Sequence, residues 1–75
     1  MSPEHLAYMA NQIGKFFASR PHDAAVAATE DHLRKFWDPR MRRQIVADLQ
    51  SGAAALDPAV REAVERLDAT AGAPA

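Results

Sequence analysis

The chain has 75 residues, a formal net charge of -1 and no cysteine. A chain of this length forms one domain and buries only roughly 60 % of the surface that it exposes when unfolded, so its core is marginal without a partner. The lack of cysteine excludes a disulfide, a zinc site with cysteine ligands and an iron-sulfur cluster held by this chain. No apolar run is long enough to span a membrane, and the first residues lack the pattern of a signal peptide, so we expect a cytoplasmic protein.

The first predicted helix starts at Ser2 and Pro3. Serine is a favourable N-cap, and proline at the first helical position loses no needed hydrogen bond. From there apolar residues recur every three or four positions and predict an amphipathic helix that ends near Ala18 and Ser19. These apolar residues are Leu6, Met9, Ala10, Ile13, Phe16 and Phe17. We expect the phenylalanine pair to lie in the core.

Pro21 begins a second amphipathic pattern, which predicts a second helix. Its apolar face holds Ala25, Val26, Thr29, Leu33, Phe36 and Trp37. On the opposite face, Glu30 lies four residues before Arg34. Asp31 has the same relation to Lys35, and ion pairs at this spacing stabilise a helix by roughly 0.2–0.5 kcal/mol each. We expect this charged face to be exposed.

Two Asp-Pro pairs, at 38–39 and 57–58, predict the starts of a third and a fourth helix. The third is expected to run to Ser51, with Gly52 as its left-handed stop. The fourth has a narrow apolar stripe formed by Val60, Ala63, Val64 and Leu67.

No alternating run rich in β-branched residues predicts a strand. The expected fold is therefore all-α, a small bundle of about four short helices. We expect one helical domain over residues 1–69 and a flexible C-terminal tail over residues 70–75. In the fourth helix, Glu62 stands four residues before Arg66 and predicts a further ion pair.

The most informative stretch is HLRKFWDPRMRR, residues 32–43, which contains the only tryptophan and five of the nine basic residues. Core packing of the aromatics and a solvated basic face would explain it within a free chain, yet tryptophan and arginine together are frequent in binding hot spots. Arg42 projects into the apolar arc of the third helix, where it must extend to the surface, pair with a carboxylate or face a partner. We expect a partner-binding surface formed by Arg34, Phe36, Trp37, Arg40, Met41, Arg42 and Arg43.

The sequence offers no catalytic site. The serines lie near predicted helix ends, the glycines stand alone, and His5, His22 and His32 lack the spacing of metal ligands. Four short helices are not expected to enclose a pocket of the ~300 Å³ that small ligands usually need. We therefore expect no catalytic, cofactor-binding or metal-binding residue in this chain, and no enzyme activity of the chain by itself.

Three blocks together cover most of the chain: MANQIGKFF (9–17), HLRKFWDPRMRR (32–43) and LDPAVREAVERL (56–67). They resemble the delta subunit of the soluble, NAD-dependent, molybdenum-containing formate dehydrogenases. The resemblance implies a small accessory subunit with no redox centre of its own. In such a complex the alpha subunit carries the molybdenum bis-pterin cofactor and iron-sulfur clusters, the beta subunit carries FMN and the NAD site, and the gamma subunit carries an iron-sulfur cluster. The whole complex oxidises formate to carbon dioxide and reduces NAD.

Three functions follow as hypotheses. In the first, the chain docks on the alpha subunit and stabilises it or supports cofactor loading. In the second, it is a transient maturation factor that holds the alpha subunit open for cofactor insertion. The third, independent of the resemblance, is a nucleic-acid-binding helical module that uses residues 34–43, and ten acidic residues oppose it. We expect neither nucleic acid nor membrane as a partner.

Overall fold

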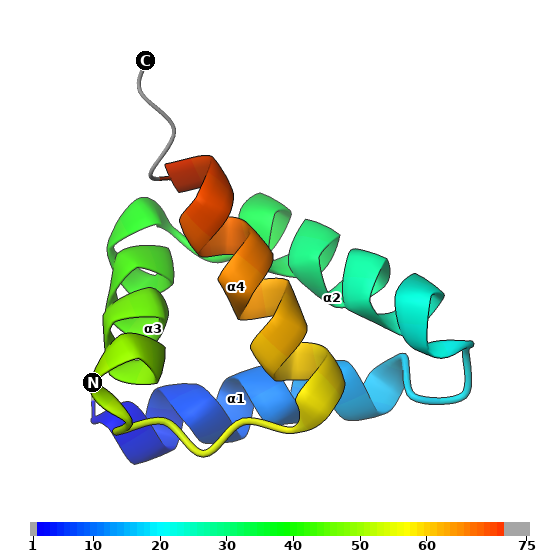
Figure 1. Ribbon diagram of the computed structural model, residues 1–75, viewed down its shortest axis with the longest axis horizontal. Coiled ribbons are helices and arrows are strands. Elements are labelled where there is room, and N and C mark those ends of the chain that lie inside the picture. The colour runs from blue at the N-terminus through cyan, green and yellow to red at the C-terminus, as the bar shows by residue number, and fades with distance from the viewer. Residues whose placement is uncertain (1, 72–75) are drawn as a thin grey trace.

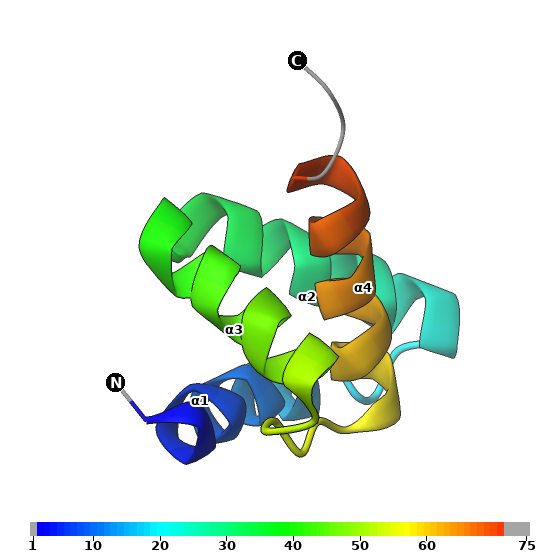
Figure 2. The same ribbon diagram turned by 60° about the vertical axis from the view of Figure 1, so that its left-hand side comes forward.

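The computed structural model describes the backbone of residues 2–71 and the side chains of residues 2–68. Four helices and no strand form this part: α1 (Pro3–Phe16), α2 (His22–Phe36), α3 (Pro39–Ser51) and α4 (Pro58–Ala71). In Figure 1, α1, α2 and α3 form the sides of a triangle and α4 crosses it. The turned view in Figure 2 shows α4 standing beside α2 and α3. The all-α prediction is confirmed.

Side-chain caps fix the starts of α1 and α3. The Ser2 hydroxyl accepts a hydrogen bond from the His5 N–H at 3.1 Å, and the Asp38 carboxylate accepts one from the Met41 N–H at 2.9 Å. Each cap satisfies a backbone donor that has no partner within the helix. At the other end of α3, Gly52 adopts the left-handed conformation with φ 80°, as predicted.

Two helix ends differ from the sequence prediction. The first helix ends at Phe16 rather than near Ser19, because the amides of residues 17 and 18 bond to carbonyls only three residues back and tighten the chain into a turn. The last helix continues to Ala71, past the predicted domain end at residue 69. Residues 72–75 of the predicted tail lie outside the described residues.

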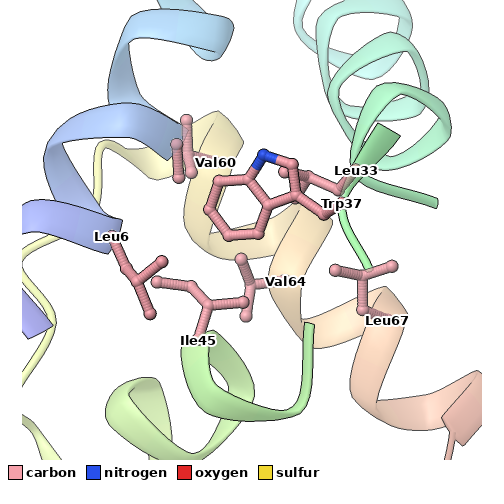
Figure 3. Packing of buried hydrophobic residues seen from close by; sticks show 8 residues of the cluster. Leu6, Leu33, Trp37, Ile45, Val60, Val64 and Leu67 are labelled. Atoms are coloured by element: carbon pink, nitrogen blue, oxygen red, sulfur yellow. The ribbon is translucent and has the colours of Figure 1, made fainter. Parts of the chain in front are cut away.

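The core lies where α4 covers the space between the other three helices. Its buried residues come from every helix and from the α2–α3 corner: Leu6, Ala10, Leu33, Trp37, Ile45, Val60, Val64 and Leu67. Figure 3 shows the indole of Trp37 among aliphatic side chains of α1, α2, α3 and α4. Because α2 and α3 diverge from their shared corner, α4 provides most of the contacts that join them.

An asparagine of α1 fastens the connection between α3 and α4. The Asn11 Nδ2 donates to the carbonyl of Ala55 at 3.0 Å, and the Asn11 Oδ1 accepts from the N–H of Asp57 at 2.9 Å. Both polar ends of the amide are thus paired with a segment more than forty residues away. These two bonds position the segment that leads into α4.

The charged side chains pair within α2, within α4 and between these two helices. The two predicted pairs within α2 are present, Arg34–Glu30 at 2.8 Å and Lys35–Asp31 at 3.0 Å. The predicted Glu62–Arg66 pair is wrong. The carboxylate of Glu62 lies 2.6 Å from the Nε2 of His22, and the Nη1 of Arg66 lies 3.7 Å from Glu30. The reason is that α4 packs along α2, so that Glu62 and Arg66 find their partners on α2 and not on their own helix.

A buried glycine allows α1 and α4 to approach closely. A Cβ placed at Gly14 would overlap the Cγ2 methyl of Val60. Glycine within a helix costs about 1 kcal/mol relative to alanine, so its place here is explained by the contact that it permits.

We expect Gly14→Ala to lower the free energy of unfolding by about 1–3 kcal/mol, because the overlap with Val60 outweighs the gain in helix propensity. Urea unfolding followed by far-UV circular dichroism measures this. Lys15→Ala, at the exposed neighbouring position, is the control and should stay within about 0.5 kcal/mol of the unsubstituted chain. An unchanged unfolding midpoint for Gly14→Ala would contradict the close approach of the two helices.

Candidate docking surface

The corner between α2 and α3 turns the side chain of Trp37 into the protein. Trp37 follows the last residue of α2 in an extended conformation, and only 6 % of the residue is exposed. Figure 3 places its ring near Leu33, Val60 and Val64. Trp37 is one of the residues expected at the partner-binding surface, and in this chain its side chain fills the core.

Arg42 is also engaged within the chain. Its Nη1 donates to the carbonyl of Arg34 at 2.7 Å and to the carbonyl of Trp37 at 2.9 Å. Both carbonyls belong to the C-terminal end of α2, where backbone acceptors lack intrahelical donors and the helix dipole is negative. The bonds explain why an arginine occupies the apolar arc of α3. Arg42 therefore caps α2 and fixes the corner, a role within the chain that the expected partner-binding surface did not include.

Two other predicted docking residues make internal contacts. Arg34 pairs with Glu30 and also donates to the carbonyl of Arg66 at 3.3 Å, which links α2 to α4. Met41 is half-buried and packs against the core. These two side chains contribute to the fold of the chain before any partner is considered.

The remaining predicted residues are exposed. Phe36 is 72 % exposed although it lies within the apolar arc of α2, because it is near one edge of that arc and the helix ends there. Arg40 and Arg43 lie one turn apart on the outer face of α3, and neither side chain forms an ion pair with the described residues. Of the seven residues expected at the partner-binding surface, Phe36, Arg40 and Arg43 are the exposed ones.

An aromatic surface that the sequence analysis missed joins Phe36 to the end of α1. The rings of Phe16 and Phe17 meet edge-on with centroids 5.1 Å apart, and the ring of Phe17 lies 6.3 Å from that of His32. His32 in turn lies 4.6 Å from Phe36. We call Phe16, Phe17, His32 and Phe36 the aromatic patch. An open hollow of about 340 Å³ adjoins it, lined by Gln12, Ile13, Phe16, Phe17 and His32.

The aromatic patch corrects the expectation that Phe16 and Phe17 lie in the core. Phe16 is 79 % exposed and Phe17 is half-buried. Gly14 faces α4, and two residues further along a helix the side chain points to nearly the opposite side. The hydrophobic pattern alone did not show which edge of the apolar arc α4 would cover, so it gave no signal that Phe16 would be left outside.

A cation lies beside these rings. The guanidinium of Arg20 is 4.9 Å from the centroid of the Phe17 ring, a distance at which the positive charge is attracted by the face of the ring. The residues lining the hollow include no carboxylate. The aromatic patch is therefore apolar at its centre and positively charged at one edge.

The described residues contain no group of three or more His, Asp or Glu side chains placed to hold a metal ion. None of the helices in residues 2–71 is long and apolar enough to cross a membrane.

The sequence model of a known family, NADH-dependent formate dehydrogenase delta subunit (FdsD), matches residues 5–64. The chain belongs to this family. The resemblance found in the three sequence blocks is thus confirmed, and with it the assignment to a subunit of a formate dehydrogenase complex. No curated protein and no solved structure shows a significant match. The matched range of the delta-subunit family contains both the α2–α3 corner and the aromatic patch.

We expect Arg42→Met to lower the free energy of unfolding by about 1.5–3 kcal/mol, because it removes a charged donor from two carbonyls at the end of α2. Arg43→Met is the matched control, since it removes the same group from the exposed neighbour and should change stability by less than about 0.5 kcal/mol. Thermal and urea unfolding of both variants measure the difference. Equal stability of the two variants would show that Arg42 does not cap α2.

Proposed function

We propose that this chain is a resident, non-catalytic accessory subunit that docks on the molybdenum-containing alpha subunit of its formate dehydrogenase. There it stabilises the alpha subunit or supports the loading of its cofactor. The observation that carries the proposal is the match to the delta-subunit family over residues 5–64. In this proposal the molybdenum bis-pterin cofactor, the iron-sulfur clusters, FMN and the NAD site belong to the alpha, beta and gamma subunits, and the complex works in the cytoplasm.

The packing of the chain supports docking as a folded body. Trp37 and the aliphatic residues around it form a core to which all four helices contribute. The chain therefore need not gain its core from the partner, and exposed aromatic rings are available for the interface. Exposed apolar clusters of this kind mark protein-binding sites on small soluble domains.

The charges in residues 34–43 favour a protein partner over nucleic acid. Lys35 pairs with Asp31, Arg34 pairs with Glu30, and Arg42 is held by backbone carbonyls. Strong binding to a phosphate backbone needs many lysine or arginine contacts, and this stretch leaves only Arg40 and Arg43 at the start of α3 for that purpose.

Purification through an affinity tag on this chain tests the proposal. We expect the alpha, beta and gamma subunits to be recovered at a fixed ratio, with molybdenum bound and with NAD-linked formate oxidation. The matched control is the enzyme purified from a strain that lacks this chain, in which we expect less alpha subunit or a lower molybdenum content per alpha subunit.

Other results of the same purification would contradict the proposal in different ways. Recovery of only a molybdenum-free alpha subunit would identify a transient maturation factor. Recovery of none of the other subunits would remove the docking role altogether.

A further inference from the structure

Two phenylalanine rings of this short chain are exposed to water and do not add to its core. Phe16 is 79 % exposed and Phe36 is 72 % exposed, and ring contacts through Phe17 and His32 connect them into one patch. Because the patch is built on the ends of two packed helices, its rings have a defined spacing before binding. Such preorganisation lowers the entropy cost of docking.

The charge that the structure places against the aromatic patch is positive, since the guanidinium of Arg20 lies 4.9 Å from the centroid of the Phe17 ring. The basic side chains near it along the chain are Lys15, Arg20, Lys35 and Arg40, and of these only Lys35 forms an ion pair with the described residues. Of the nearest carboxylates along the chain, Asp31 pairs with Lys35 and Asp38 has no ion-pair partner among the described residues, so three unpaired basic side chains stand against one acidic side chain. A complementary surface would be apolar at its centre and acidic at its rim.

We propose that the aromatic patch is the docking surface of this chain, and that it inserts Phe16 and Phe36 into an apolar groove bordered by carboxylates on the alpha subunit. This inference rests on the proposed function and names the part of the chain that performs it. The basic residues at the rim guide association and fix the orientation, while the buried rings supply most of the affinity.

The size of the chain limits where such an interface lies. A standard interface covers roughly 800 Å² on each partner, which is about a sixth of the 4693 Å² of surface that the chain exposes. A footprint of that size takes up most of one face. A footprint centred on the aromatic patch includes the C-terminal ends of α1 and α2 and covers two of the three large apolar side chains that are exposed in residues 2–68.

A second copy of this chain fits the aromatic patch less well than an acidic partner. In a symmetric dimer each patch would face an identical patch. Arg20 and Lys15 of one copy would then approach the same cations of the other copy, and like charges at an interface oppose association.

The test measures binding of the full chain to the purified alpha, beta and gamma complex prepared from a strain lacking this chain. We expect Phe16→Ala and Phe36→Ala each to raise the dissociation constant at least about 30-fold, the size of effect that marks a hot spot. Tyr8→Ala is the matched control, because Tyr8 is another exposed large side chain of α1 outside the patch, and we expect a change below about threefold. The thermal melting of all three variants should match the unsubstituted chain, since the altered side chains are exposed.

The association rate tests the acidic rim that we propose for the alpha subunit. We expect Arg20→Glu to slow association, and we expect added salt to slow association of the unsubstituted chain more than that of Arg20→Gln. An association rate that does not respond to either substitution would overturn the acidic rim.

The possible failures are distinguishable. If the unsubstituted chain binds and both phenylalanine variants bind equally well, the aromatic patch is not the docking surface, although the proposed function stands. If the unsubstituted chain does not bind the complex, the proposed function fails and this inference fails with it. If the chain is a dimer that Phe16→Ala dissociates, the patch is a self-association surface and the inference is overturned.

Discussion

In this protein a single indole ring fills the space that α1, α2 and α3 leave between them and that α4 covers. Trp37 is the largest side chain of the core, and a buried tryptophan removes about 150–250 Å² from water. Its burial requires α2 to end and the backbone to extend, and the two hydrogen bonds from Arg42 hold the chain in that path. The position of α4, which packs on the other side of the ring, depends on this corner.

At this corner two aromatic residues that are adjacent in the sequence have different surroundings. Phe36 is the last residue of α2 and is exposed, whereas Trp37 is the first residue beyond it and is buried. Under the proposed docking, substitution of either ring weakens the complex, for Phe36 through a lost contact with the partner and for Trp37 through a lost core. Only a stability measurement on the isolated chain separates these causes, because loss of the buried ring destabilises the chain and loss of the exposed ring does not.

The features that the sequence predicted are those set by neighbouring residues. The caps at Ser2 and Asp38 and the stop at Gly52 act within one turn of the chain, and the helices that they bound were predicted closely. Burial was predicted less well, because hydrophobic periodicity gives the apolar arc of a helix but not which edge the rest of the chain covers. Phe16 was left outside for this reason. The candidate site was predicted in part: Phe36 belongs to the expected stretch, but the patch also includes Phe16 and Phe17 at the end of α1, which connect to Phe36 through His32.

The contacts that place α4 join distant parts of the chain. Asn11 bonds to Ala55 and Asp57 across 44 and 46 residues, and His22 meets Glu62 across 40. A bundle in which each helix packs mainly on the next one closes short loops, but this chain must close long loops before its core exists, and long-range contacts slow folding. The first three helices form an open frame without α4. The chain should therefore fold in one cooperative step that is slow for an all-helical protein of its size, with no stable intermediate made of α1, α2 and α3 alone.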